Sequence, residues 1–551
     1  MFPMLPGDTD ALRKARGAFF TPAPIARFVA EWAIRSAADA VLEPSCGEAV
    51  FLHEAGRGGR HRGPLIGIEL HAESAAEAQR TLRAEEIAAE IRSGDFFLTE
   101  PSGDFDAVIG NPPYVRYQDF AGDSRARSRA AALRAGVSLT GLASSWAAFT
   151  VHSALFLKPG GRLGLVLPAE LLTVNYATDV RRFLMQHFRS VGLVMFVERV
   201  FPGVLEEVVL LLADGFDPSG QNGTDHCDVY QVQNADDLSS SPVANKWRPA
   251  SRSAKWTASL LAADAAGVFA EITSDDRFGL LQDWGETTLG MVTGNNGYFA
   301  LSPERADELA LSADDLVPLS PPGSRHLRGL AFTTAARHAL GEQGSATWLF
   351  RPTARPSAAA QRYIDEGEAR GVHLAYKCRV RTPWWRVPYL KPADLLLTYM
   401  NADAPRLVTN RARAHHLNSV HGVYLRPELR RAGADLLPLA CLNSATLVGA
   451  ETVGRAYGGG MLKLEPREAD ALPVPGPAFL AAHREAISAL RPAVVRALSR
   501  GRLADAVAVV DEVLLVDALG LDAAGLHAIR DARSLLAARR TARGRRAVRD
   551  A

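Results

Sequence analysis

The chain has 551 residues, too many for one ordinary hydrophobic core, so we expect two or three domains. Its hydrophobic content of 47% is that of a soluble globular protein, and no apolar run reaches the ~18 residues that a membrane span needs. The first residues lack the charged and then apolar layout of a secretory signal, so we expect a cytoplasmic protein that does not contact a membrane.

Charge and cysteine spacing narrow the class of protein further. The formal net charge is only +1, but residues 371–430 contain ten Lys or Arg and three Asp or Glu, a local balance of +7. Such a stretch favours a polyanionic partner. The four cysteines lie far apart and lack the spacing of a zinc site, so we predict a reducing compartment and no bound metal. They are Cys46, Cys227, Cys378 and Cys441.

The first predicted elements in chain order are a capped helix and a strand that ends in a tight turn. Thr21 is placed to cap a helix that Pro22 starts, since proline suits the first helical turn. Residues 41–51 are typical of a strand, a turn and a helix start, and such a turn in an open α/β sheet binds ligands. Ala49 stands where a dinucleotide-binding turn has its second glycine, so we do not expect a pyrophosphate site.

Carboxylates follow the next two predicted strands. Strand 65–69 ends in Glu69, which is placed to accept hydrogen bonds from both ribose hydroxyls of a nucleoside. Further on, Asp95 could accept from an adenine amine while Phe96 packs on the ring. Each of these residues alone also fits a structural role, as a strand-end carboxylate or a core aromatic. Suitable groups at four successive strand ends favour a nucleoside site.

The fourth strand end is the segment around which the chain is organised. The apolar run 105–110 predicts a buried strand, and Asn111, Pro112, Pro113 and Tyr114 follow it. The prolines lack N–H donors and hold φ near about −65°, so the backbone must leave the sheet with its carbonyls exposed to a cleft. Two acceptors that grip the two hydrogens of an exocyclic amine would make its nitrogen nucleophilic and stabilise the developing positive charge.

These segments, in this order, resemble the amino (N6-adenine) DNA methyltransferases. The likeness is greatest to the gamma group, in which the Thr-Pro segment and the cofactor motifs precede Asn-Pro-Pro-Tyr and the recognition domain comes last. It covers residues 10–215 most closely. The resemblance implies a doubly wound, Rossmann-like α/β sheet of seven strands with the last antiparallel. It also implies S-adenosylmethionine as the methyl donor.

The same resemblance assigns roles to the site residues. Thr21 and Glu43 would hold the methionine end of the cofactor, Glu69 the ribose, and Asp95 and Phe96 the adenine. The whole set of expected cofactor-binding residues is Thr21, Pro22, Glu43, Pro44, Ser45, Cys46, Gly47, Glu69, Asp95 and Phe96. Phe201 matches a family position whose ring stacks on the flipped-out adenine, on the face opposite Tyr114.

Changes in composition predict the domain boundaries. We expect a catalytic domain over 1–215, a polar, turn-rich linker over 216–250, and a mixed α+β target-recognition domain over 251–475. Residues 476–551 are rich in Ala and Leu and predict a helical tail whose last part contains seven Arg. That tail fits a solvated helix and a DNA-contacting arm equally well.

The basic stretch predicts a DNA-binding surface in the recognition domain. Arg can make two hydrogen bonds to a purine edge or neutralise a phosphate, and aromatic residues lie among the cations. The expected DNA-binding residues are Arg379, Arg381, Trp384, Trp385, Arg386, Arg411 and Arg413.

Several functions fit these motifs. The favoured one is methylation of adenine N6 in double-stranded DNA, within a restriction-modification or phage-defence system, with a separate cognate endonuclease as a partner that the family implies. Methyltransferases of protein glutamine or of RNA guanine must also make a weakly nucleophilic nitrogen reactive, so they fit the same turn. The Thr-Pro segment and the long basic second half disfavour them. A catalytically inactive DNA-specificity subunit is disfavoured by the intact acceptors. A C5-cytosine enzyme needs a nucleophilic thiol, commonly after proline, and the chain has no Pro-Cys pair.

Overall fold

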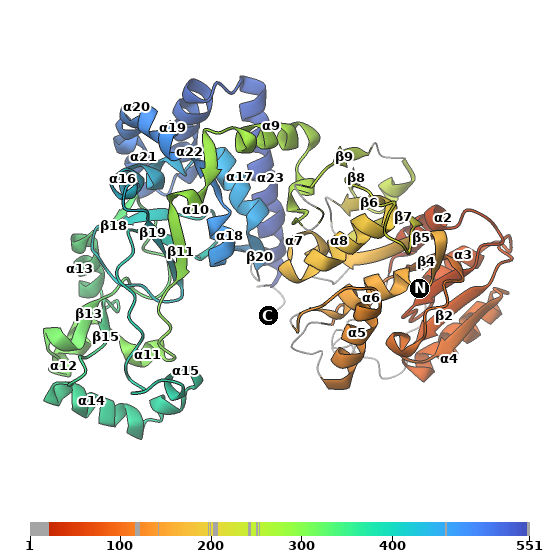
Figure 1. Ribbon diagram of the computed structural model, residues 1–551, viewed down its shortest axis with the longest axis horizontal. Coiled ribbons are helices and arrows are strands. Elements are labelled where there is room, and N and C mark those ends of the chain that lie inside the picture. Colours follow the sequence, from red (N-terminus) through yellow and green to blue (C-terminus); the bar gives the residue numbers. More distant parts are fainter. Residues whose placement is uncertain are drawn as a thin grey trace. The chain divides into compact units, whose positions relative to one another are not determined.

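The computed structural model divides the chain into two compact units, unit 1 over residues 1–260 and unit 2 over residues 261–551 (Figure 1). The structure describes residues 21–115, 122–141, 143–196, 198, 200–201, 208–240, 244–249, 252, 254–457 and 460–547. Each unit has its own core and is described by itself.

Unit 1 is built on one large sheet, so the predicted α/β class is confirmed. Its described strands run in the order β3-β2-β1-β4-β5-β7-β6-β8-β9. Strands β1 to β5 are mutually parallel where they pair, while β7 is antiparallel to both β5 and β6. The bounds are β1 Val41–Pro44, β2 Leu65–Glu69, β3 Ala89–Ser93, β4 Phe105–Gly110, β5 Leu157–Pro168, β6 Phe188–Phe196, β7 Val208–Phe216, β8 Cys227–Val232 and β9 Asn245–Trp247.

Helices cover the sheet of unit 1 in two groups. One group is α2 (Ala23–Ala33) with α3 (Val50–Gly56), and the other is α5 (Gly122–Arg134), α6 (Ser145–Ala154) and α8 (Thr178–His187). Strands β4, β6 and β7 and the second half of β5 are largely buried because they are covered in this way, which explains their apolar runs. Among the described residues of unit 1, α4 (Ala72–Ala84) also packs on β2 and β3, and α7 (Glu170–Thr173) lies beside β5.

Residues 216–250, expected as a linker, contain two strands that extend the sheet beyond the seven that we predicted. Strand β8 lies parallel to β6, and β9 lies antiparallel to β8. In β8, Cys227 and Val229 are buried while Asp228 between them is partly exposed. This alternation has the period of a half-buried strand, but it spans only six residues in a polar, turn-rich segment. The sequence pattern was therefore too short to reveal it.

Unit 2 has a mixed α+β architecture made of small sheets. The largest has the order β11-β19-β16-β18-β14, two others are β12-β15-β13 and β17-β21-β20, and β10 pairs with β22. The strands are β10 Phe278–Leu280, β11 Gly285–Leu289, β12 Ala300–Leu301, β13 Leu316–Pro318, β14 Ala331–Phe332, β15 Trp348–Phe350, β16 Leu395–Thr398, β17 Met400–Asn401, β18 Leu407–Asn410, β19 Val420–Leu425, β20 Arg455–Tyr457, β21 Met461–Lys463 and β22 Pro473–Pro475.

The helices of unit 2 pack around these sheets and form its C-terminal part. They are α9 Ala263–Ser274, α10 Leu281–Trp284, α11 Asn296–Phe299, α12 Pro303–Glu308, α13 Thr334–Glu342, α14 Ala358–Ala369, α15 Tyr376–Arg379, α16 Arg430–Ala440, α17 Ser444–Val453, α18 Pro466–Asp470, α19 Pro477–Ala482, α20 Arg484–Ala489, α21 Arg491–Ser499, α22 Leu503–Asp511 and α23 Ala523–Ala547. Among the described residues no single helix has the length and apolar composition of a membrane span; α16 and α17 reach that threshold only as a pair bent by 91°.

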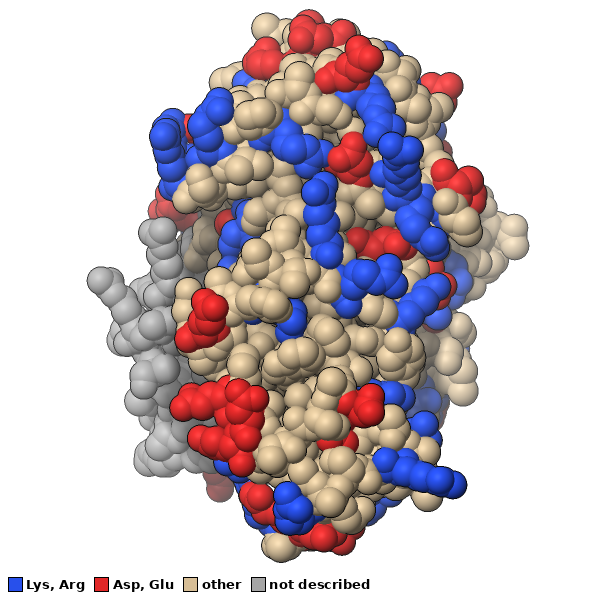
Figure 2. All heavy atoms as spheres, turned by 90° about the vertical axis from the view of Figure 1, so that its left-hand side faces the viewer, with Lys and Arg blue, Asp and Glu red and all other residues tan. Residues whose placement is uncertain are grey.

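The surface of unit 2 carries charge unevenly. Figure 2 shows the face on which Lys and Arg side chains cluster over the upper half, while a compact group of Asp and Glu lies at the lower left. On this face, Lys and Arg are more numerous in the upper half, although Asp and Glu also lie there.

Buried ion pairs hold the C-terminal helix of unit 2 in place. On α23, Arg540 is 3% exposed, and its guanidinium donates to the carboxylate of Glu451 at 3.0 Å. It also donates to the carbonyls of Ala402 at 3.2 Å and Asp403 at 3.0 Å. The end of α23 is thus fixed to the loop after β17, and Arg540 has the role of a packing residue.

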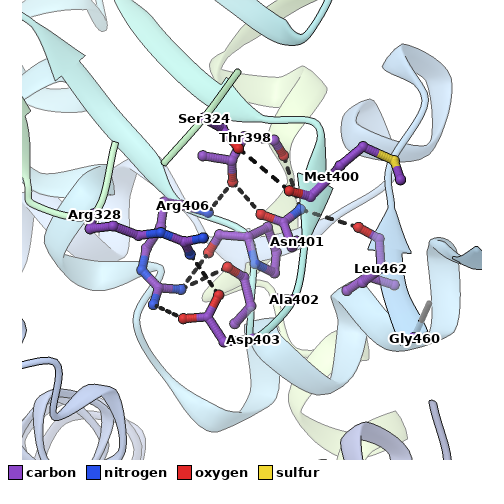
Figure 3. Close-up of polar contacts among 12 residues, drawn as sticks. Ser324, Arg328, Thr398, Met400, Asn401, Ala402, Asp403, Arg406, Gly460 and Leu462 are labelled. Carbon is purple, nitrogen blue, oxygen red and sulfur yellow. Dashed lines mark hydrogen bonds and ion pairs between the residues drawn. The ribbon is translucent and has the colours of Figure 1, made fainter. Parts of the chain in front are cut away.

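That loop is closed by its own polar contacts, shown in Figure 3. Arg328 and Arg406 converge on the carboxylate of Asp403, at 2.7 and 2.8 Å, and the Thr398 hydroxyl accepts from the Arg406 backbone N–H at 2.8 Å. The buried Asn401 amide donates to the Thr398 carbonyl at 3.1 Å. Most polar groups of this region therefore bond to one another.

Candidate active site

The predicted cofactor segments of unit 1 meet at one edge of its sheet. Because β1, β2 and β3 are parallel neighbours, their carboxyl ends lie together. Hydrogen bonds join them directly: Gly47 N–H donates to the Glu69 carboxylate at 2.9 Å, and Gly94 N–H donates to the Glu69 carbonyl at 2.8 Å. Three segments chosen from the sequence therefore form one continuous surface.

The turn after β1 adopts an unusual backbone conformation. Ser45, Gly47 and Ala49 have φ values of +57°, +53° and +56°, in the left-handed region that favours glycine. Each of the two residues with a Cβ is disfavoured there by about 1–2 kcal/mol. A Cβ built on Gly47 meets nothing within 4 Å, so a ligand could approach the backbone at that point.

Glu43 lies deeper than we expected. It is 2% exposed, and its carboxylate accepts from the backbone N–H of Leu52 in α3 at 3.0 Å. Burial raises the pKa of this carboxyl well above its usual value, and hydrogen bonds from the amides of Leu52 and Phe51 partly oppose the shift. The residue therefore joins the turn to α3, and its contact with the methionine end of a cofactor stays a prediction.

Glu69 is positioned as the sequence predicts. It is 6% exposed at the end of β2, where one carboxylate oxygen accepts from His71 N–H and the other from Gly47 N–H, each at 2.9 Å. Each oxygen has lone-pair capacity for a further donor. The two backbone bonds fix the orientation of the carboxylate, which leaves it suited to a pair of hydroxyl groups.

Asp95 and Phe96 have separate environments although they are neighbours. One oxygen of Asp95 accepts from Phe97 N–H at 3.0 Å, and the other pairs with Arg127 at 3.2 Å. Phe96 is 3% exposed, and its ring stacks on Phe149 with a centroid distance of 5.4 Å. The structure thus places Phe96 in the core, the structural role considered above, while Asp95 lies nearer the surface.

The predicted catalytic turn follows β4, which pairs with β1 on one side and β5 on the other. The Asn111 side-chain N–H donates to the Thr21 hydroxyl at 3.1 Å. The Tyr114 hydroxyl contacts the Asn111 side-chain oxygen at 2.7 Å and the Val166 carbonyl at 3.0 Å. Asn111 is thereby joined to Thr21, which the sequence assigns to the cofactor, and to Tyr114, which it assigns to the target base.

Ser145, which sequence reasoning missed, braces this turn. Its hydroxyl accepts from Val115 N–H at 2.9 Å and donates to the Pro113 carbonyl, and its own N–H donates to the Val115 carbonyl at 3.1 Å. Ser145 is buried at the start of α6. No spacing in the sequence marks this contact, because it joins positions about thirty residues apart.

A second missed group follows β5. The Glu170 carboxylate accepts from the indole N–H of Trp146 at 3.3 Å and from the Tyr176 hydroxyl at 2.5 Å. Burial and the nearby carboxylate raise the pKa of Tyr176. Because β5 is the neighbour of β4, Glu170 at its end lies beside the catalytic turn. Its hydrogen bonds hold Trp146 and Tyr176 at the same edge of the sheet.

Phe201, the predicted stacking partner of the base, is 5% exposed. Residues 197, 199 and 202–207 around it lie outside the described residues. The stacking role of Phe201 accordingly stays a prediction.

The predicted DNA-binding residues of unit 2 separate into two sets. Arg381 donates to the Thr293 carbonyl, Trp384 donates to Glu368 at 2.9 Å, and Trp385 belongs to the hydrophobic core. These three side chains make contacts within unit 2, and their assignment to DNA stays a prediction. The exposed members are Arg379, Arg386, Arg411 and Arg413.

No group of three or more His, Cys, Asp or Glu side chains within the described ranges could hold a metal ion. The four cysteines are buried and free. Burial raises the pKa of the Cys46 thiol well above its usual value.

Comparison with known proteins confirms the resemblance inferred from the motifs. Residues 68–201 match the family described as Eco57I restriction-modification methylase, and residues 253–515 match the C-terminal domain of the type II methyltransferase M.Eco57I. Type II methyltransferase M.AccI of Acinetobacter calcoaceticus is 23% identical over 483 residues, which are 83% of this chain and 84% of that protein. M.XamI of Xanthomonas campestris pv. amaranthicola is 26% identical over 471 residues, 83% of this chain and 85% of that protein.

Proposed function

We propose that this chain, which resembles type II restriction-modification methyltransferases over most of its length, transfers a methyl group from S-adenosylmethionine to adenine N6 in duplex DNA. The observation that carries the proposal is the bonded set at the end of β4. There Asn111 contacts both Thr21 and Tyr114, one strand away from the turn that contacts Glu69.

Two oxygens of the catalytic turn are suited to grip the amine. The Pro113 carbonyl already accepts from Ser145, whereas within the described part of the chain the Pro112 carbonyl has no hydrogen-bond partner. The Asn111 side-chain oxygen, which the Tyr114 hydroxyl contacts, is the second amide-type acceptor of the turn. We therefore assign the Pro112 carbonyl and the Asn111 oxygen to the two hydrogens of N6.

The residues at the neighbouring strand ends fit the cofactor. Glu69 presents a fixed carboxylate with remaining acceptor capacity, and a Cβ on Gly47 or Gly94 would point into open space. Thr21, Glu43, Glu69 and Asp95 would hold the cofactor. S-adenosylmethionine supplies an electrophilic methyl group when bound.

The reaction then needs little further chemistry from the protein. With the methyl donor bound, the N6 lone pair would take the methyl group from the sulfonium sulfur, which would leave as a thioether, and one N6 proton would pass to solvent water. Asn111 and Pro112 stabilise the positive charge that develops on N6 before that proton leaves. An adenine inside a duplex must first be extruded, at a free-energy cost of a few kcal/mol, and we assign stacking on the extruded base to Tyr114 and Phe201.

The test is to incubate the full chain with plasmid DNA and labelled methyl donor, and then to identify the modified nucleoside by mass spectrometry. We expect N6-methyladenine at one short sequence, and mapping the modified sites defines that sequence. Absence of label in DNA, or label only in methylcytosine, contradicts the proposal. Protein glutamine and structured RNA serve as competing acceptors in the same assay.

A further inference from the structure

One segment of unit 2 exposes an unusual number of large apolar side chains. Leu374, Tyr376, Val380 and Tyr389 are 64%, 64%, 61% and 54% exposed. They lie within sixteen residues: Leu374 just before α15, Tyr376 on it, and Val380 and Tyr389 after it. Exposed apolar side chains are normally scattered singly, and a contiguous group of them marks an interaction site. We call residues 374–391 the α15 surface.

The same segment is strongly cationic. There is no Asp or Glu between Arg370 and Ala393. Lys377, Arg379, Arg386 and Lys391 are exposed. Within the part of the chain that the structure describes, none of these four cations has a carboxylate partner within ion-pair distance. A partner that binds here must supply negative charge together with flat or apolar groups, since Tyr376 and Tyr389 present rings.

A rigid base supports the exposed side chains. Cys378, between Lys377 and Arg379, is fully buried in the hydrophobic core with Trp385 and Val387. The Arg381 guanidinium donates to the Thr293 carbonyl and to the Cys378 sulfur at 3.0 Å. The inward side chains therefore fix the backbone, so that the outward ones lose little conformational freedom on binding.

We propose that the α15 surface binds duplex DNA through two separate contributions. Lys377 and Arg379 neutralise phosphates, while Tyr376 and Val380, four residues apart and therefore on the same face of the short helical turn, contact sugars or bases. This inference rests on the proposed function and deepens it, because it assigns apolar recognition groups that composition alone does not reveal. Duplex DNA fits because it combines closely spaced anionic charge with apolar edges.

The two contributions respond differently to salt, so binding measurements separate them. Replacing Lys377 and Arg379 by Gln should reduce the slope of log K against log[salt] by about 2, because each phosphate contact contributes about 0.9. Replacing Tyr376 and Val380 by Ala should weaken binding roughly 10-fold at every salt concentration, with the slope unchanged. The matched control is Val495→Ala with Arg500→Gln, an exposed apolar and cationic pair on α21 and just after it.

The measurement uses the full chain and one duplex of fixed sequence cut from the plasmid of the methylation assay, titrated at four or more salt concentrations. Equal affinity and slope for wild type and both α15 variants would overturn the inference. So would a change in the sedimentation of the DNA-free chain with DNA binding unaltered, because the surface would then serve a second copy. If an alanine variant unfolds early in a thermal melt, Tyr376→Ser and Arg379→Gln as single changes repeat the test.

The result can be separated from the fate of the proposed function. A wild-type chain that methylates DNA while the variants bind normally leaves the function intact and removes the α15 surface. If the variants bind DNA less well and the wild type does not methylate DNA, the α15 surface stands and the proposed function is removed.

Discussion

The two units use buried polar side chains in opposite ways. In unit 1, the buried Glu69 carboxylate is oriented by two backbone N–H donors yet keeps acceptor capacity at the edge of the sheet. In unit 2, Arg540 and Asp511 are surrounded by partners within the unit; the Asp511 carboxylate accepts from Ser444 twice and from Arg530 at 2.9 Å. Burial of a polar group therefore marks a reactive site only where its bonding capacity is incomplete.

The largest effect that this contrast predicts is on the stability of unit 2. Arg540→Met should reduce the free energy of unfolding by roughly 3–5 kcal/mol, because Glu451 would be left buried without its cation. Chemical denaturation monitored by hydrogen exchange should show the loss of stability in unit 2 and not in the sheet of unit 1. The double variant Arg540→Met/Glu451→Met should recover most of the stability, and Arg500→Met should change little. Equal destabilisation by Arg500→Met would refute the role of the pair.

Asn111→Ala should leave stability nearly unchanged and reduce methyl transfer roughly 10²–10³-fold, the range expected for loss of one charge-stabilising group. The single-turnover rate and the Kd for the cofactor are the two measurements that check it. Asn222→Ala, an exposed amide of unit 1, is the control. A transfer rate within a factor of three of wild type would remove Asn111 from the reaction.

Acid should destabilise unit 2 through His416. Burial lowers the pKa of His416 to about 4, so below about 6.5 the unfolded chain takes up a proton that the folded one does not. Stability is thus present above pH 6.5 and falls as the pH drops towards 4, by roughly 3 kcal/mol over the full interval. Neither ring nitrogen has a hydrogen-bond partner, so His416→Leu should flatten this slope. His527→Leu, at an exposed position, should not; an unaltered slope for His416→Leu would contradict the assignment.

Glu69→Gln should weaken cofactor binding roughly 10-fold, because an amide has one oxygen in place of two and cannot accept as many hydrogen bonds. Calorimetric titration with the cofactor measures the change directly. Glu90→Gln, on the adjacent strand but exposed, provides the comparison. A Kd equal to that of wild type would separate Glu69 from the cofactor.

The smallest effect concerns Ser145. Ser145→Ala should lower kcat by about 2- to 10-fold with KM for DNA unchanged. The reason is that one ordinary hydrogen bond contributes about 0.5–1.5 kcal/mol, here to the position of the turn. Ser153→Ala is the matched control, because that hydroxyl lies buried on the same helix without a hydrogen-bond partner. Ser145→Thr should restore part of kcat. A loss shared equally by Ser145→Ala and Ser153→Ala would indicate a general effect on α6.

Sequence reasoning reached the site where local patterns determined it. The strand ends at Glu69 and Asn111 could be predicted because parallel strands bring their carboxyl ends to one edge, whatever the intervening loops do. Ser145 and Glu170 could not, because their roles depend on contacts with residues that no periodicity connects to them. Composition also failed to distinguish Arg381 and Trp385 from Arg379, since alternate inward and outward placement on so short a segment follows from tertiary packing.

Ala49 adopts a backbone conformation that favours glycine, with φ of +56°. The contact between Ala49 N–H and the Cys46 carbonyl at 2.7 Å holds the turn closed in spite of the Cβ.

The two strands beyond β7 matter for anyone who wishes to isolate the first unit. A fragment cut at residue 215 would uncover β6, a nine-residue strand that is apolar and buried almost throughout, and open edges of this kind join other chains into aggregates. Strand β9, by contrast, is three residues long and carries Lys246, both of which discourage further pairing. A truncation after residue 260 keeps that protective border, and solubility of the two fragments on expression should differ accordingly.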